Sequence, residues 1–289
     1  MATKRRGVRT VVYAPEFPMG PMRVKQPLPS QTLDQVSPFV LLHHASPQKY
    51  EQGATAHRIE PHPHRGFEPV TFVFQGEVYH RDSRGNEGIV GAGEVQWMTA
   101  GSGILHSEGP SPRFVERGGT LELVQLWINL PRAYKMMEPK YQDIHRGDIP
   151  VVMLADGAAR AHVVAGSLGD VTGPATTSTP INAIMLYMDA GASFELDFGS
   201  HTSAMLYLLK GSINVNGSHD VGEHYLTVFD ETTGVVTVTA REAGYALVLS
   251  GEPIDEPVVA SGPFVMNSQD EIRAAWRDFV AGKMGQLVD

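Results

Sequence analysis

Two short stretches of this 289-residue chain combine residue types that bind metal ions. The first contains His62 and His64, and the second contains His106 and Glu108. On a β-strand, side chains two positions apart point to the same face, so each pair would present its donors about 7 Å apart on one side. Pro63 disfavours a helix here, where the ligand spacing would be four residues. Two neutral imidazoles on one face can bind one ion at about 2.0–2.2 Å each.

Three imidazoles and one carboxylate would leave one or two positions of an octahedral metal open. Open positions accept water, dioxygen or a substrate, and this donor set suits Fe(II), Mn, Ni or Cu better than a closed structural zinc site. The glycine-rich turn at residues 101–103 lets the backbone bend into the second pair. The alternative is that these are polar residues at the mouth of a barrel, paired with one another. Four such groups inside a small barrel need compensation for their lost hydration, and a metal is the simplest.

The segments around these residues have the pattern of short antiparallel strands. β-branched and aromatic runs alternate with glycine turns over about residues 39–130 and again from residue 181, as in a barrel or sandwich. Two strands that end on Gly76 and Gly211 look alike and indicate a duplicated barrel. Residues 131–150 are polar and are predicted to be a connector. The predicted strands are 70–74, 77–80, 120–129, 183–188, 204–209, 212–215, 235–239 and 245–249.

Composition narrows the classes of protein that fit. Hydrophobic residues make up 42% and charged residues 19%, which is enough apolar surface for a packed core. A formal net charge of −9 without a basic stripe disfavours binding to nucleic acid. No apolar run approaches about 18 residues and no secretory signal is visible, so we expect no membrane span and a cytoplasmic location. Because the chain has no cysteine and 12 histidines, imidazole and carboxylate must hold any transition metal.

The C-terminal region has the pattern of an amphipathic helix. Ser268 and Glu271 form a capping box, in which the hydroxyl and the carboxylate satisfy the first free amides. The helix is predicted to end near Gly282 and either to cover a barrel as a lid or to bind a partner. Its apolar face consists of Ile272, Ala275, Trp276, Phe279 and Val280.

Both metal-binding stretches resemble the signature of the pirins, a branch of the cupin superfamily. The matching segments are residues 62–68 (HPHRGFE) and 96–108 (QWMTAGSGILHSE), with further similarity at 37–42 and 262–267. The resemblance implies an all-β bicupin: two antiparallel jelly-roll barrels facing each other, with a short C-terminal helix. Residues 1–135 would form the metal-binding barrel and residues 136–289 a barrel without metal ligands, ending in the helix. The implied ligands of one Fe(2+), with Mn, Ni, Cu or Zn as alternatives, are His62, His64, His106 and Glu108.

The resemblance also implies an activity. Pirins are similar to quercetin 2,3-dioxygenases, which use O₂ to open the central ring of a flavonol with loss of carbon monoxide. Glu108 would then be both ligand and base, and Phe72, Phe74 and Met98 would supply apolar walls. The alternative is an iron-dependent, redox-sensing regulator that contacts a transcription factor or a metabolic enzyme, which the acidic charge also fits. A third possibility is another oxygenase or an isomerase, because fold does not determine chemistry.

Several further polar residues need an interpretation. Glu68 occupies the place where many other cupins have a carboxylate ligand; we expect it behind the histidines or in the pocket wall, with direct ligation left open. Matching Gly211 to Gly76 places Asp197 and Gly199 where a second histidine pair would be. His57 and His80 could line the barrel mouth. The histidines predicted to lie in loops or at the surface are His43, His44, His201, His219 and His224.

Overall fold

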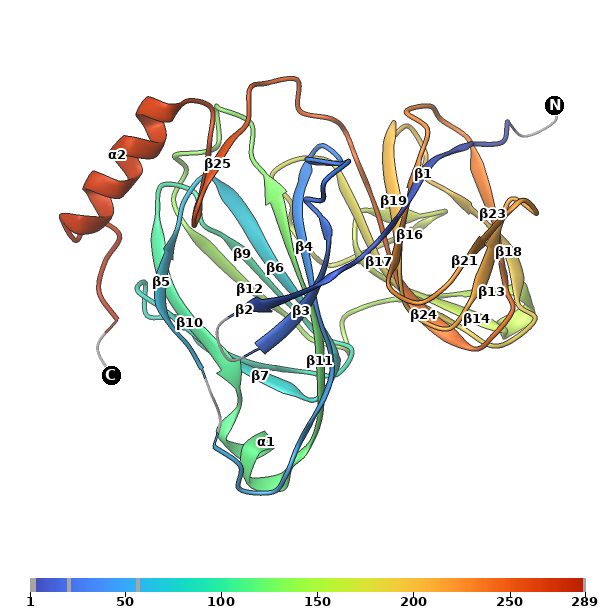
Figure 1. Cartoon of the computed structure of the whole chain (residues 1–289), viewed down its shortest axis with the longest axis horizontal. Coiled ribbons are helices and arrows are strands. Elements are labelled where there is room, and N and C mark those ends of the chain that lie inside the picture. The colour runs from blue at the N-terminus through green and yellow to red at the C-terminus, as the bar shows by residue number, and fades with distance from the viewer. Residues whose placement is uncertain (1–3, 20–21, 56–57, 288–289) are drawn as a thin grey trace. The chain divides into compact units, whose positions relative to one another are not determined.

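The computed structural model describes residues 4–19, 22–55 and 58–287, and most of their regular structure is antiparallel β-sheet (Figure 1). The chain divides into two compact units, and each is built from separate segments of the sequence. We call them the histidine unit and the apolar unit. The histidine unit consists of Phe17–Val24, Phe39–Arg146 and Ile254–Asp289, and the apolar unit consists of Met1–Glu16, Lys25–Pro38 and Gly147–Pro253. Among the described residues, no helix is long and apolar enough to cross a membrane.

The histidine unit contains a seven-stranded and a four-stranded sheet. Their strand orders are β12-β9-β6-β11-β4-β3-β2 and β5-β10-β7-β8. The short hairpin β25-β26 and helix α2 complete the unit. The elements are β2 (Glu16–Met19), β3 (Met22–Leu28), β4 (Phe39–Tyr50), β5 (Ile59–His64), β6 (Phe67–Gln75), β7 (Glu77–Asp82), β8 (Glu87–Gly91), β9 (Val95–Thr99), β10 (Ile104–Pro110), α1 (Pro112–Arg117), β11 (Gly119–Asn129), β12 (Lys140–Ile144), β25 (Val259–Ser261), β26 (Phe264–Met266) and α2 (Gln269–Val280).

The apolar unit repeats this plan with sheets β1-β22-β19-β24-β17-β14-β13 and β18-β23-β20-β21. Its interior is one large cluster of buried apolar side chains from both sheets. The elements are β1 (Val8–Tyr13), β13 (Val151–Leu154), the 3₁₀ turn η1 (Ala155–Gly157), β14 (Ala159–Ala165), β15 (Ser167–Leu168), β16 (Val171–Thr172), β17 (Ile181–Met188), β18 (Ser193–Asp197), β19 (Ser203–Lys210), β20 (Ile213–Val215), β21 (His219–Val221), β22 (Tyr225–Phe229), β23 (Val235–Ala240) and β24 (Gly244–Gly251).

The strand order shows the duplication that the sequence predicts. The eight consecutive strands β4–β11 occupy the same places in their sheets as β17–β24. Gly76 and Gly211 sit at equivalent points, where the chain leaves the larger sheet for the smaller one, with φ of 82° and 90°. A Cβ at Gly76 would lie 2.7 Å from the Thr120 carbonyl oxygen, and one at Gly211 would lie 2.9 Å from that of Ala243. Each unit is therefore a two-sheet jelly roll, and the all-β bicupin class is confirmed.

Two predicted boundaries differ from the structure. The division expected between residues 135 and 136 does not match the units, because residues 254–289 belong with the histidine unit and residues 1–16 with the apolar unit. The interpretation of residues 131–150 as a connector is wrong, since β12 within it pairs with β9 and Tyr141 faces Met98 in the register. Lys135 in the same stretch is almost fully buried. All eight strands predicted from the sequence are present.

Helix α2 begins at the predicted cap. The Ser268 hydroxyl accepts from the amide of Glu271 at 3.2 Å, and the Glu271 carboxylate accepts from the amide of Asn267 at 2.8 Å. Ile272 and Ala275 are buried in a cluster with residues of β26, so the helix covers part of its own unit. The apolar face is narrower than predicted: Trp276 is 41% exposed, and Val280, the last helical residue, is 82% exposed.

Candidate metal centre

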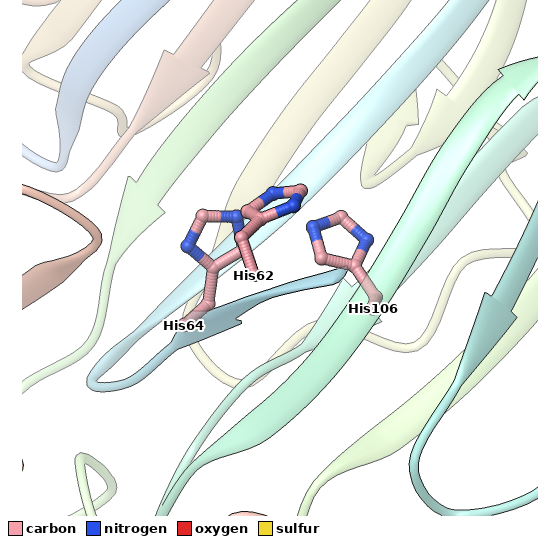
Figure 2. A group of neighbouring side chains, drawn as sticks. All are labelled: His62, His64 and His106. Atoms are coloured by element: carbon pink, nitrogen blue, oxygen red, sulfur yellow. The ribbon is translucent and has the colours of Figure 1, made fainter. Parts of the chain in front are cut away.

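Three imidazoles converge in the histidine unit. His62 and His64 extend from the same face of β5, and His106 extends from β10, where the strand register places it opposite His62 (Figure 2). The ring centroids lie 4.3 Å apart for His62 and His106 and 4.8 Å apart for His64 and His106. One ring nitrogen from each residue lies within 4.8 Å of the other two. One metal ion could therefore contact all three.

Hydrogen bonds to main-chain carbonyls determine which ring nitrogen of His62 and of His64 is free to bind a metal. Nδ1 of His62 lies 2.8 Å from the Glu60 carbonyl oxygen, and Nδ1 of His64 lies 3.2 Å from that of Pro263. Because a carbonyl can only accept, Nδ1 carries the proton in both rings and Nε2 keeps its lone pair. Nε2 of His64 and Nε2 of His106 are buried without a hydrogen-bond partner among the described residues. Buried ring nitrogens that keep a lone pair and lack a hydrogen-bond partner are suited to bind a metal ion.

Burial keeps the two inner imidazoles neutral. It lowers the pKa of His64 and of His106 well below the usual range, and the neighbouring His62 lowers both further. The Pro263 carbonyl opposes this lowering of the His64 pKa by accepting a hydrogen bond from Nδ1 of the ring. Since a metal binds the neutral ring, the site requires little deprotonation before an ion enters.

Glu108 lies beside the three histidines rather than among them. It follows His106 on β10 after a shift in the register with β5, and its carboxylate is not part of the three-histidine group. Its Oε1 accepts from Nε2 of Gln125 at 2.6 Å, and Oε1 of Gln125 accepts from the indole of Trp127 at 3.2 Å. Oε2 of Glu108 is buried without a hydrogen-bond partner in the described part of the chain. Coordination by Glu108 stays a prediction.

A cavity of about 490 Å³ opens beside the histidines. Its polar lining includes His62, His64, Glu108 and Gln125, and its apolar lining includes Leu41, Ile59, Trp127 and Pro263. The predicted walls Phe72, Phe74 and Met98 do not line it, since they are buried within the unit and Met98 packs against Ala100 and Ile104. The apolar walls come instead from strands β4, β5 and β11 and from the residues before β26.

Two histidines predicted in a loop lie in a strand. His43 and His44 are both on β4, so their side chains point to opposite faces. His43 lines the cavity, and burial lowers its pKa to about 4. His44 is fully buried, and its Nε2 lies 3.0 Å from a carboxylate oxygen of Glu122. Residues 41–49 contain no β-branched or aromatic residue, which explains why the pattern does not predict that β4 continues through both histidines.

Glu68 and His80 are also buried. The Glu68 carboxylate accepts from the Thr99 hydroxyl at 2.7 Å and from the Trp97 indole at 3.3 Å, and it lies outside the three-histidine group. His80, predicted at the barrel mouth, is fully buried next to His106. The spacing of His80 in the sequence gives no sign of this contact, which arises because β7 pairs with β10. His57, the other residue predicted at the mouth, lies outside the described residues.

The equivalent strands of the apolar unit carry different residues. In β18 and β23, Phe194, Leu196, Val236 and Val238 are buried in the apolar core. Asp197 ends β18 with an exposed side chain that accepts from the amide of Gly199 at 2.9 Å. The histidines of this unit are dispersed, and one of them, His162, is in β14. His201 lies in a loop but is buried against Ser250, His219 is in β21, and His224 is in the turn before β22.

Two family models match the chain: Pirin over residues 21–128 and the pirin C-terminal cupin domain over residues 183–285. The chain is 45% identical over 248 residues to a protein of Pseudomonas aeruginosa that is provisionally named a quercetin 2,3-dioxygenase, with 86% of each chain covered. It is 39% identical over 229 residues to Pirin-1 of Arabidopsis thaliana, which covers 78% of this chain and 77% of the relative.

Solved structures with the same fold include quercetin 2,3-dioxygenase from Acinetobacter baumannii. Its TM-score is 0.94 at 36% identity, and the match covers 99% of this chain and 100% of the other. A bacterial pirin from Escherichia coli, solved in complex with nickel(II), has a TM-score of 0.67 at 18% identity and covers 85% of this chain and 99% of its own. This second match shows a shared fold.

Proposed function

Because the chain belongs to the pirin family of cupin proteins, we propose that it is a mononuclear non-haem metal dioxygenase that cleaves quercetin or a related flavonol. The reaction would insert both atoms of O₂, open the central ring and release carbon monoxide. The observation that carries this proposal is the convergence of three imidazoles, two with buried unpaired Nε2 atoms, in a cavity with apolar walls. The names of the Pseudomonas and Acinetobacter relatives support the same reaction.

The proposed metal is Fe(2+), with Mn, Ni, Cu or Zn as alternatives that the same donors accept. His62, His64 and His106 would hold it, with Glu108 as the fourth ligand. When bound, any of these ions would supply the Lewis acidity that lowers the pKa of a substrate hydroxyl, and Fe(2+) would also supply the redox chemistry that activates dioxygen. The nickel(II) complex of the Escherichia coli pirin supports a divalent ion in this fold.

The chain itself would orient the substrate and accept its proton. Oε2 of Glu108 faces no hydrogen-bond donor among the described residues and can take the proton of an enolic hydroxyl, while Gln125 fixes the other oxygen. Trp127 and Leu41 offer flat apolar surface to aromatic rings. A cavity of about 490 Å³ lies within the range of about 300–1,000 Å³ that small organic ligands occupy.

An anaerobic loading experiment tests the proposed activity. The protein is loaded with Fe(II), mixed with quercetin and exposed to air, and both the flavonol absorbance and released carbon monoxide are followed. We expect turnover by the wild type and by His219→Ala, a histidine of the apolar unit, but not by His62→Ala. The proposal fails if the wild type does not exceed His62→Ala with Fe, Mn, Ni or Cu.

One observation favours regulation through protein contact as a second candidate function. Arg65, next to His64, donates to the Ser102 carbonyl at 2.7 Å and to Asp278 of α2 at 3.0 Å. The same helix exposes Trp276 and Val280, so a change at the metal centre could reach an apolar surface. The partner would be a transcription factor or a metabolic enzyme. Hydrogen exchange over residues 269–280 would differ between Fe(II)- and Fe(III)-loaded protein, and identical exchange argues against this role.

A further inference from the structure

One of the three converging histidines has a different partner from the other two. Nδ1 of His62 and Nδ1 of His64 face main-chain carbonyl oxygens. Nδ1 of His106 lies instead 3.5 Å from Nδ1 of another imidazole, His80. Both rings are buried, with their centroids 5.3 Å apart. The partner of His106 is therefore a side chain that can itself be a donor or an acceptor.

The surrounding contacts determine which nitrogen of His80 carries the proton. Nε2 of His106, like that of His64, is buried without a hydrogen-bond partner among the described residues. If this nitrogen binds the proposed metal, the proton of the ring is on Nδ1 and points to His80. The side-chain amide nitrogen of Gln96 lies 2.7 Å from the same Nδ1 of His80. Two donors directed at one nitrogen require it to be unprotonated. The proton of His80 is then on Nε2, which lies 3.6 Å from Oδ2 of Asp82, an ion-pair contact that is longer than a hydrogen bond.

Neighbouring groups hold His80 and Asp82 in place. The ring of Tyr141 stacks on His80 with centroids 4.7 Å apart and planes inclined by 14°. The Asp82 carboxylate accepts from the amides of Arg84 and Asn86 at 2.8 and 3.1 Å and from the Asn86 side chain at 2.9 Å. Burial raises the pKa of Asp82, but the contact with His80 and the hydrogen bonds from Asn86 and Arg84 outweigh it and keep the pKa below its usual range, so this side chain is a carboxylate.

We infer that His80 is a positioning residue for His106. It accepts the Nδ1 proton of His106, so that Nε2 presents its lone pair to the metal, and it transmits the negative charge of Asp82 to that ring. When the ring nitrogen that does not bind the metal donates a hydrogen bond to such a partner, the imidazole is held in one orientation and is a more basic ligand than one without that hydrogen bond. His106 thereby differs from His62 and His64, whose outer partners are neutral carbonyls. The inference rests on the proposed metal centre.

Two substitutions separate the hydrogen bond from packing. His80→Phe keeps a ring that can stack on Tyr141 but cannot accept a proton, whereas the side-chain oxygen of His80→Gln can accept one. We expect His80→Phe to weaken Ni(II) binding by about 10–100-fold in competition with a chelator, and His80→Gln to recover most of that loss. The ligand-field absorption of the Co(II)-loaded protein should shift in His80→Phe and return toward wild type in His80→Gln. His80→Leu serves the same purpose if His80→Phe does not fold.

His44→Phe is the matched control, because His44 is equally buried in the same unit but pairs with Glu122. We expect it to lower stability without changing Ni(II) affinity or the Co(II) spectrum. Equal Ni(II) binding by wild type and His80→Phe would overturn the inference, as would equal losses in folded His80→Phe and His80→Gln. A wild type without Ni(II) binding would overturn both this role and the metal centre. Ni(II) binding without quercetin turnover contradicts only the proposed activity.

Discussion

Lys135 carries a buried positive charge, and we expect the stability of the protein to rise when that charge is removed by alkaline pH. Its Nζ donates to the carbonyl oxygens of Gly66 and Val265 at 2.8 and 2.9 Å and to Oδ1 of Asn129 at 2.6 Å. The side chain is only 2% exposed. Burial lowers the pKa of this ammonium from 10.5 to about 8, although the charges of Glu256 and Glu271 act in the opposite direction.

The direction of the pH effect follows from these two pKa values. Between about pH 8 and 10.5 the folded chain loses this proton before the unfolded chain does, so the unfolded state binds more protons and the free energy of unfolding rises with pH. The full interval corresponds to about 3 kcal/mol, at 1.36 kcal/mol for each pH unit. Between about pH 7.5 and 9.5, the same relation gives a gain of about 2 kcal/mol.

Urea unfolding of the metal-free protein, followed by tryptophan fluorescence at pH 7.5 and 9.5, measures this gain. Other groups also titrate in this range, so the quantity of interest is the difference between wild type and Lys135→Met. The control is Lys49→Met, which removes an amine that is 77% exposed and should leave the pH dependence unchanged. If wild type and Lys135→Met gain equal stability between the two pH values, the explanation by burial is refuted.

Three further substitutions have defined outcomes. His64→Ala should abolish stoichiometric metal binding, measured by elemental analysis after desalting, while His219→Ala should retain it; equal metal content in both would contradict the proposed centre. Glu108→Gln should lower quercetin turnover by about 100-fold or more, and a rate near that of wild type would exclude a role as base. Ser268→Ala removes the cap of α2 and should lower the free energy of unfolding by about 1 kcal/mol, whereas an unchanged urea midpoint would show that the cap contributes nothing.

Local patterns predicted the parts of the fold and the site that depend on neighbouring residues. The i, i+2 spacing of His62 and His64 is a property of one strand, and the structure places both rings on one face. The capping box of α2 is equally local, since Ser268 and Glu271 are three residues apart. The equivalence of Gly76 and Gly211 followed from similar strands about 135 residues apart.

Features that depend on distant segments could not be predicted in this way. Lys135 lies in a polar stretch, and its burial depends on acceptors at Gly66 and Val265 that the fold brings to it. Phe72 is predicted to form a cavity wall because it belongs to the apolar interior of the barrel, but which residues of a strand meet the cavity depends on the opposite sheet. Likewise, nothing in the spacing of His80 predicts that its ring meets His106 across β7 and β10.

The order in which the ribosome releases the chain has a consequence for maturation. The Pro263 carbonyl that orients His64, and the Val265 carbonyl that accepts from Lys135, both come from a segment synthesised more than a hundred residues after the histidines. The intervening residues 147–253 build the other unit. The residues of the second jelly roll are therefore available to fold before the first can be completed, and the carbonyls that orient His64 and hold Lys135 reach the chain only after residues 147–253 have been synthesised.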